Sequence, residues 1–268
     1  MSLNALSIAG YDPSGGAGVL ADVRTFNWYG IYGAAVITAI TFQDTHKVHG
    51  HMPLRGEDVK AQMEALLEDM DFAAAKIGML ANAEIVRVVA DLLERYRVRN
   101  VVLDPVLLSS SGAPLLDSEG VEALLKVLLP SVKIITPNVP EAEALTGVAI
   151  RSPEDMEMAA RRLLGYGAEA VLIKGGHLEG EPVDVLRVRG DDGDRTYRFL
   201  GTRVSKDVHG TGCVLSSSIA SLLAMGHDVA TAVSLAISDI REDLRSRTLK
   251  VGGGRLVIFR NPTVKYTP

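Results

Sequence analysis

The sequence predicts an α/β fold with a mostly parallel central sheet and helices on both of its faces. Short apolar runs alternate along the chain with longer segments in which apolar residues recur at helical spacing. The 268 residues, 47% of them hydrophobic and 23% charged, are enough to build one large domain with a substantial core. No internal repeat or linker interrupts the alternation, so we expect a single domain over residues 1–268.

The first half of the chain is expected to contain four strands and the helices between them. The segment 57–70 is typical of a helix, because Val59, Met63 and Leu66 fall on one face. The segment 84–96 shows the same spacing. The predicted strands cover residues 3–9, 33–41, 73–77 and 100–103, and a further helix begins at Val19.

The second half continues the alternation and adds a hairpin. Residues 183–188 and 196–200 alternate in polarity around the turn Asp191-Asp192-Gly193-Asp194, which indicates antiparallel strands. Residues 241–268 hold seven basic and two acidic residues and a strand-like LVIF run. The tail 248–268 is left unassigned, because it could form either a dimer edge or a solvated basic segment. Further helices are predicted at 118–129, 153–166 and 228–247, and further strands at 132–136 and 170–173.

Composition excludes several classes of protein. The formal net charge of −5 argues against a nucleic-acid binder, which usually presents a basic face. The chain lacks the run of about 18 apolar residues that a membrane span needs, and its first residues do not resemble a signal peptide. The single cysteine cannot form an internal disulfide and fits a reducing compartment, so we expect a cytoplasmic protein.

The segment His209-Gly210-Thr211-Gly212-Cys213 predicts a ligand site, because its glycines lead directly into a run of small and apolar residues. Such a run is typical of a buried helix, whose first N–H groups can hold an anion. A thiol at a helix N-terminus has a lowered pKa and can act as a base or a nucleophile. The alternative is a glycine-rich loop that only caps a core helix.

Polar residues follow several of the predicted strands directly, namely Gln43, Asp104, Asn138 and Lys174. Ligands of open α/β sheets bind at the carboxyl ends of the strands, so these residues predict a shared cleft. Asn138 and Glu141 offer hard oxygen atoms that could hold Mg²⁺ through water, although the same residues are typical of a helix N-cap. Lys174, beside two glycines, suits a nucleotide phosphate.

Three motifs carry a resemblance to a known family. The segment GTGC at residues 210–213 resembles the anion-hole motif of ribokinase-like kinases, most of which have aspartate at the fourth position. Cysteine there is the mark of the hydroxymethylpyrimidine/phosphomethylpyrimidine kinases of thiamine biosynthesis. GYDPSGGAGVLAD, from Gly10, resembles their opening motif GSDPSGGAGIQAD, and TPNVPEAE, from Thr136, matches their Thr-Pro-Asn-x-x-Glu-Ala-Glu motif. The resemblance covers about residues 5–240.

This resemblance implies an ATP-dependent kinase that phosphorylates 4-amino-5-hydroxymethyl-2-methylpyrimidine and then its monophosphate. It implies ATP and Mg²⁺ as cofactors and a homodimer that binds neither nucleic acid nor membrane. Cys213 is expected to act as the base beside an anion hole formed by Gly210, Thr211 and Gly212. The resemblance assigns Gly10, Asp22, Gln43, Met79 and Val106 to the substrate, Asp104, Asn138, Glu141 and Lys174 to ATP, and Asp104 and Glu141 to Mg²⁺ through water.

The sequence departs from the family pattern at Tyr11, Leu20, Asp44, Ser110 and Val208. Ser110 stands where a lysine often brings a positive charge to the phosphates. Two alternatives therefore remain open. One is a pyridoxal or pyridoxine kinase of the same fold, and the other is a nucleotide- or vitamin-binding sensor that has lost catalysis. A sugar kinase is disfavoured because position 213 lacks the aspartate.

Overall fold

The computed structural model describes residues 3–108, 112, 114–176, 181–202 and 206–260. Its centre is a nine-stranded sheet in which the neighbouring strands from β2 to β7 run parallel and the edge strands β3, β8 and β9 run antiparallel. The predicted fold class is therefore confirmed. In spatial order the strands are β3 (Val48–Pro53), β2 (Tyr32–Gln43), β1 (Asn4–Tyr11), β4 (Ala74–Ile77), β5 (Val101–Leu103), β6 (Ile134–Ile135), β7 (Ala170–Ile173), β8 (Val183–Val188) and β9 (Arg195–Leu200).

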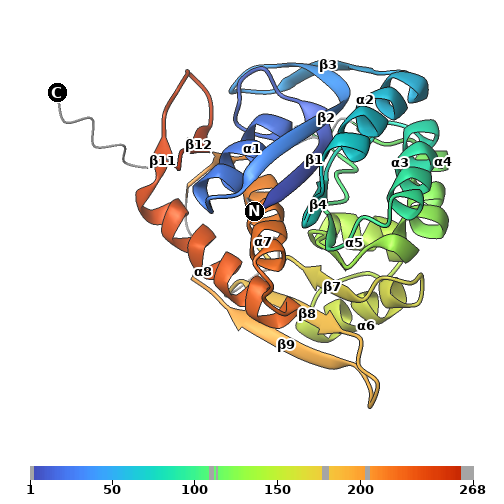
Figure 1. The fold of residues 1–268 in the computed structure, drawn as a ribbon. Helices are drawn as coiled ribbons and strands as arrows, with labels where there is room; N and C mark the ends of the chain where they lie inside the picture. Colours follow the sequence, from blue (N-terminus) through green and yellow to red (C-terminus); the bar gives the residue numbers. More distant parts are fainter. Residues whose placement is uncertain (1–2, 109–111, 113, 177–180, 203–205, 261–268) are drawn as a thin grey trace.

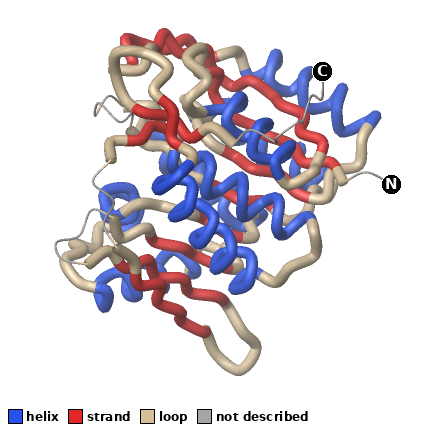
Figure 2. Tube along the Cα trace, turned by 90° about the vertical axis from the view of Figure 1, so that its left-hand side faces the viewer, coloured by secondary structure: helices blue, strands red, loops and turns tan. Residues whose placement is uncertain are grey.

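Helices cover both faces of this sheet, as Figures 1 and 2 show. Successive residues of the buried strands point to opposite faces: Leu103 belongs to one hydrophobic cluster, and its neighbour Val102 belongs to the other. One face carries α1 (Gly18–Trp28), α7 (Thr211–Ala224) and α8 (Val229–Ser246). The other carries α2 (Gly56–Asp69), α3 (Ala83–Arg95), α4 (Ser118–Ala123), α5 (Val139–Thr146) and α6 (Pro153–Leu164).

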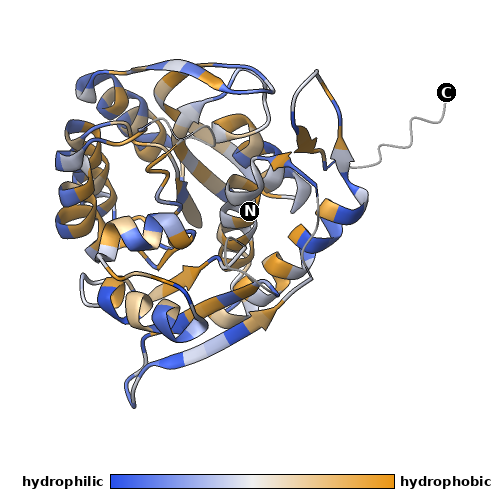
Figure 3. Cartoon of the chain, turned by 180° about the vertical axis from the view of Figure 1, so that it is seen from behind, coloured by the Kyte–Doolittle hydropathy of each residue, from blue (hydrophilic) through white to orange (hydrophobic). Residues whose placement is uncertain are grey.

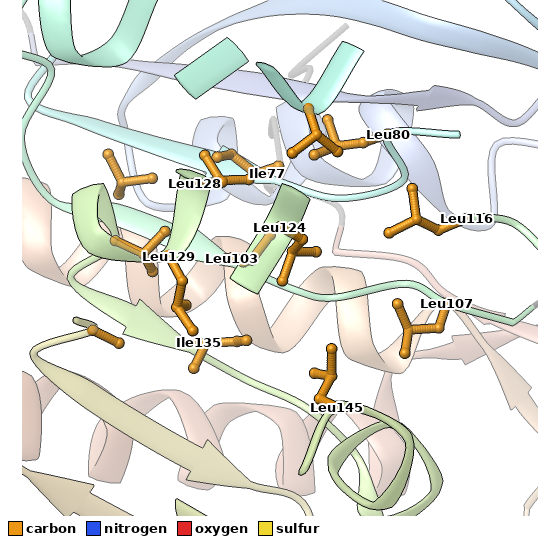
Figure 4. Packing of buried hydrophobic residues seen from close by; sticks show 14 of the residues in the cluster. Ile77, Leu80, Leu103, Leu107, Leu116, Leu124, Leu128, Leu129, Ile135 and Leu145 are labelled. Carbon is orange, nitrogen blue, oxygen red and sulfur yellow. The ribbon is translucent and has the colours of Figure 1, made fainter. Parts of the chain in front are cut away.

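The segment after α4 departs from the regular helix expected at 118–129. The α-helix ends at Ala123 and continues as a π-helical turn (Leu124–Leu128) and a 3-10 turn (Leu129–Ser131) that contains Pro130. This change of pitch still buries Leu124, Leu128 and Leu129 completely or almost so. Figure 4 shows these side chains packed in one cluster with leucines and isoleucines of β4, β5 and β6.

Of the antiparallel edge strands, the sequence predicts the β8–β9 hairpin but not β3. The β8–β9 hairpin is confirmed, and Figure 3 shows that its projecting turn is hydrophilic. Strand β3 was not predicted, because VHGHMP is polar and only partly buried and has no apolar alternation. It nevertheless pairs with β2 from Ala39 to Gln43 and supports the end of that strand.

The part of the tail that the structure describes folds onto the body of the molecule. A small three-stranded sheet joins β10 (Val208–His209), β12 (Leu256–Ile258) and β11 (Thr248–Leu249), with β12 parallel to β10. The Arg260 guanidinium donates to the buried Asp243 carboxylate of α8 at 2.7 Å. Val257, Ile258 and Arg260 are buried, so a fully solvated segment is the wrong interpretation for this part of the tail, although residues 249–253 are exposed. Among the described residues, no helix combines the length and hydropathy needed to cross a membrane.

Candidate functional site

A cavity of about 510 Å³ lies at the carboxyl ends of the parallel strands, where the sequence predicts a cleft. It collects residues that are far apart in the chain and that come from strand ends, from the glycine-rich loop before α1 and from the start of α7. Twelve of the thirteen predicted site residues line it: Gly10, Gln43, Met79, Asp104, Val106, Asn138, Glu141, Lys174, Gly210, Thr211, Gly212 and Cys213.

The start of α7 has the backbone geometry that an anion site requires. Gly210 is the N-cap residue with φ of 80°, a left-handed conformation that glycine adopts without strain. A side chain on Gly210 would collide with the carbonyl oxygen of Gly16, so the two glycine-rich loops pack directly against each other. The helix begins at Thr211, and its N-cap makes no side-chain hydrogen bond to the first turn. These N–H groups are therefore available to an anion in the cavity.

The Cys213 thiol lies in the first turn of α7 and lines this cavity. Burial raises its pKa to about 11, while Lys76 and the Gly18 N–H lower it and the carboxylates of Asp22 and Asp104 raise it. The expected lowered pKa is wrong for the free protein, because the loss of water and the two acidic neighbours outweigh the lysine and the Gly18 N–H.

Lys174 and Asp104 form an ion pair at the base of the cavity. The Lys174 Nζ donates to Asp104 Oδ1 at 2.9 Å, and the Thr136 hydroxyl donates to the same oxygen at 3.2 Å. Burial opposes the ionisation of Asp104, but Lys174 and Lys76 hold its pKa below the ordinary value. The pair therefore presents a fixed ammonium group to the cavity.

Asn138 and Glu141 form the N-terminal capping box of α5. The Glu141 N–H donates to Asn138 Oδ1 at 2.9 Å, and the Asn138 N–H donates to Glu141 Oε2 at 2.8 Å. Burial raises the pKa of Glu141 to about 7, with Lys174 opposing the shift and Asp104 adding to it. The capping interpretation is confirmed, and the same carboxylate still lines the cavity.

The described residues contain no cluster of three acidic, histidine or cysteine side chains that could bind a metal directly. Mg²⁺ prefers to keep several waters and to take its remaining ligands from carboxylates and substrate phosphates. Asp104 and Glu141 fit such a water-mediated role, since both carboxylates line one end of the cavity beside Lys174.

Gly10, Met79, Gln43 and His209 form another part of the cavity lining. A Cβ on Gly10 would lie 3.1 Å from the Met79 sulfur, so the glycine leaves the face of Met79 open. The Gln43 side-chain nitrogen lies 2.7 Å from His209 Nε2 and donates to Asp12 Oδ2 at 3.4 Å. His209 also contacts Asp12 at 3.1 Å.

Asp22 is the one predicted site residue that does not line the cavity. Its side chain is completely buried, and its oxygens accept hydrogen bonds from Ser7 at 2.6 Å, Lys76 at 2.9 Å and Ser217 at 2.8 Å. The expected direct contact between Asp22 and the substrate is therefore wrong. Its partner Lys76 lines the cavity instead.

Sequence reasoning missed several lining residues. Lys76 carried a signal, since a lysine inside the short apolar strand β4 must be buried with a partner. His209 was noticed only as a neighbour of the glycines. Arg255 carried no signal, because its place depends on the tail sheet that pairs β12 with β10.

The departures from the family pattern are spread unevenly around the site. Val208 lines the cavity, whereas Tyr11 and Leu20 do not. Asp44 also lies outside it, because its carboxylate accepts from the backbone of His46 and contacts the ring of His49 in the β2–β3 turn. Ser110 lies outside the described residues.

Comparison with known proteins gives consistent matches. Residues 12–258 match the family described as phosphomethylpyrimidine kinase. A hydroxymethylpyrimidine/phosphomethylpyrimidine kinase of Aquifex aeolicus is 46% identical over 252 residues, which cover 93% of this chain and 97% of that protein. The crystal structure of phosphomethylpyrimidine kinase from Clostridium difficile superposes with a TM-score of 0.78 at 42% identity, over 90% of this chain and 99% of that one. Pyridoxal kinase from Staphylococcus aureus, in complex with AMP-PCP and pyridoxal, superposes with a TM-score of 0.83 at 29% identity, over 96% and 93% of the two chains.

Proposed function

The chain belongs to the phosphomethylpyrimidine kinase family, and we propose that its cavity transfers the γ-phosphoryl group of ATP to 4-amino-5-hydroxymethyl-2-methylpyrimidine. A second round on the monophosphate yields the diphosphate for thiamine biosynthesis. The observation that carries the proposal is that the start of α7, the Lys174–Asp104 pair and the pocket around Gln43 and Met79 open into one cavity.

ATP is assigned to the end of the cavity that holds Asn138, Glu141 and Lys174. The Lys174 ammonium is already fixed by Asp104, so it can contact a phosphate without first being ordered. Mg²⁺ would supply charge neutralisation on the phosphates when bound, with Asp104 and Glu141 holding its waters. A kinase from this fold has been solved with the ATP analogue AMP-PCP, which supports the use of ATP.

The pyrimidine ring is assigned to the end lined by Gly10, Gln43, Met79 and Val106. The Gln43 amide carries one acceptor and two donors, which suits the edge of an aminopyrimidine, and a bound ring would replace its present contacts to His209 and Asp12. Met79 is almost completely buried and presents a polarizable sulfur to the ring face. In this proposal the hydroxymethyl group points towards Cys213 and the start of α7.

The chain's own residues then support the transfer in two ways. Backbone N–H groups at Gly210, Thr211 and Gly212 stabilise the negative charge that builds on the transferred phosphoryl group. The Cys213 thiolate takes the proton from the hydroxymethyl oxygen as that oxygen bonds to phosphorus and the bond to ADP breaks. In the second round, the phosphate of the monophosphate is the acceptor.

ATP turnover tests this function directly. ADP release should depend on the pyrimidine alcohol and, separately, on its monophosphate, and Cys213→Ala should lower kcat by about 10²-fold or more. Gly226→Ala, at the far end of α7, serves as the matched control. Turnover of neither pyrimidine would overturn the proposal, and undiminished turnover by Cys213→Ala would overturn the assignment of the base.

Assays with several ring substrates distinguish a pyrimidine kinase from a pyridoxal kinase. The superposition with a pyridoxal kinase makes pyridoxal and pyridoxine the relevant competitors. We expect a higher kcat/KM for the pyrimidine alcohol, because identity to the pyrimidine kinases, at 46% and 42%, exceeds the 29% identity to the pyridoxal kinase. A preference for pyridoxal would reverse the assignment. The sensor alternative is not retained, since the relatives are phosphotransferases over nearly their whole length.

A further inference from the structure

A completely buried ion pair lies beneath the cavity. The Lys76 side chain of β4 and the Asp22 side chain of α1 both have no exposed surface, and the Lys76 Nζ donates to Asp22 Oδ2 at 2.9 Å. Gly78 leaves room for this ammonium group, because a Cβ there would lie 2.9 Å from the Lys76 Nζ. The lysine is therefore held in one position by its partner and by the space around it.

The α7 helix places this ion pair next to Cys213. Cys213 and Ser217 are four residues apart, so their side chains lie on the same helix face, one turn apart. The Ser217 hydroxyl donates to Asp22 Oδ1 at 2.8 Å, which fixes that face of α7 over the ion pair. Lys76 and Cys213 both line the cavity, whereas Asp22 does not. The lysine is thus the member of the pair that faces the site.

Stability alone is a weak reason to bury such a pair. Removing two charges from water is costly, and buried ion pairs can often be replaced by apolar residues without loss of stability. Here three partners (Ser7, Lys76 and Ser217) satisfy the Asp22 carboxylate, although it contacts no part of the cavity. The hydrogen bonds from Ser7 and Ser217 fix the Asp22 carboxylate, and the carboxylate in turn orients the Lys76 ammonium group.

We propose that Lys76 is a positioning residue that stabilises the thiolate form of Cys213, and that Asp22 fixes its position through a hydrogen bond that an asparagine oxygen can also accept. The proton balance is simple. Between turnovers the thiol loses its proton to solvent and the Lys76 ammonium stabilises the resulting anion. During transfer the thiolate takes the hydroxyl proton while the oxygen–phosphorus bond forms and the bond to ADP breaks. The part of the inference that concerns turnover rests on the proposed function.

The charges around Cys213 predict substitutions of opposite sign. Four charged groups act on or respond to the thiol: Lys76 of β4, Asp22 of α1, Asp104 after β5 and Lys174 after β7. Lys76 lowers the pKa of Cys213, whereas Asp22 and Asp104 raise it, and Lys76 is the member of the ion pair that lines the cavity together with Cys213. Removing the lysine charge should therefore raise the pKa, and removing the Asp22 charge should lower it.

The only cysteine in the chain makes the test direct. The rate of alkylation by iodoacetamide is measured between pH 7 and pH 10 on the full chain without ATP or Mg²⁺. Below the pKa this rate follows the thiolate fraction, so it changes about tenfold for each unit of pKa shift. We expect Lys76→Met to lower the rate at pH 9 about tenfold, Asp22→Asn to raise it, and Lys76→Arg to restore it. The exposed Lys60→Met variant should match the unchanged protein.

A second variant covers the risk that one unpaired buried charge prevents folding. The double variant Asp22→Asn/Lys76→Met leaves no uncompensated charge, and its thiol should still react more slowly than the unchanged protein. An equal or faster rate in that variant, or shifts of the same sign in the two single variants, would overturn the proposal. The alkylation rate needs no substrate, so its failure is distinguishable from a failure of kinase turnover.

Discussion

Lys174 and Asp104, 70 residues apart, are joined by a 2.9 Å hydrogen bond directly beneath the anion site. A Cβ on Gly212 would lie 3.2 Å from the Asp104 carboxylate and 3.4 Å from the Lys174 Nζ. A side chain at this position would therefore press against the ion pair. The start of α7 therefore rests on a fixed ion pair from the ends of two strands, and phosphate binding and anion stabilisation share one rigid surface.

Lys174→Met should weaken nucleotide binding and catalysis. The variant loses a charge-assisted contact to phosphate, so kcat/KM for ATP should fall about 10- to 100-fold. The buried Asp104 carboxylate would also lose its main partner, so its pKa should rise. Steady-state ADP release gives the first quantity. Lys133→Met, which removes a lysine paired with Glu169 at the other end of the sheet, is the control. Equal kinetics in both variants would contradict the assignment.

Gly210→Ala should damage the anion site more than the fold. Alanine at a φ of 80° costs about 1–2 kcal/mol, and here its Cβ would also collide with the Gly16 carbonyl oxygen. The first N–H groups of α7 should then shift, and kcat should fall about 10²-fold. Gly226→Ala has a similar φ of 91° and open space around it, so it should lose stability but keep its activity. If both variants have a similar kcat, the collision at Gly210 does not affect catalysis, and the anion site is not at the start of α7.

Much of the fold was predictable because its elements are locally determined. The strands and amphipathic helices have their own apolar periodicity, and the capping box at Asn138 and Glu141 is visible as sequence. The site could also be predicted, because parallel strands place the residues that follow them at the same edge of the sheet. Lys174 and Asp104 could therefore be brought together without knowledge of any contact.

The remaining features depend on contacts that local sequence does not encode. The role of Asp22 differed from expectation because its neighbours Ser7 and Ser217 come from β1 and α7. The tail could not be placed, since β12 is defined by its pairing with β10. The raised pKa of Cys213 also depends on burial, which local sequence does not show.

Glu141 should make the stability of the protein depend on pH. Its pKa is raised to about 7 in the folded state, so its contribution to stability is complete below its ordinary value near 4.5 and is lost as the pH rises through 7. Relative to Glu141→Gln, the unchanged protein should lose on the order of 1–3 kcal/mol of unfolding free energy between pH 4.5 and pH 8.

Urea unfolding of both proteins at several pH values measures this difference. Glu57→Gln, which removes an exposed carboxylate at the start of α2, controls for the change of net charge. A gap between the unchanged protein and Glu141→Gln that is constant with pH would show that Glu141 ionises normally in the folded state.

Catalysis should accelerate with pH if Cys213 is the base. Its pKa is raised to about 11 in the free protein, and only the thiolate can accept the hydroxyl proton. kcat/KM for the pyrimidine alcohol, which reports the free enzyme, should therefore rise about tenfold per pH unit from pH 7 towards pH 10 where proton removal limits the rate.

Cys213→Asp isolates this effect. A carboxylate is already ionised near neutral pH, so the variant should show a nearly flat profile over the same range, whatever its absolute rate. Circular dichroism at each pH excludes unfolding as the cause of a difference. A flat profile for the unchanged protein, or parallel slopes for the two proteins, would mean that another group accepts the proton, because the thiol's ionisation is the only step that the substitution removes from this pH range.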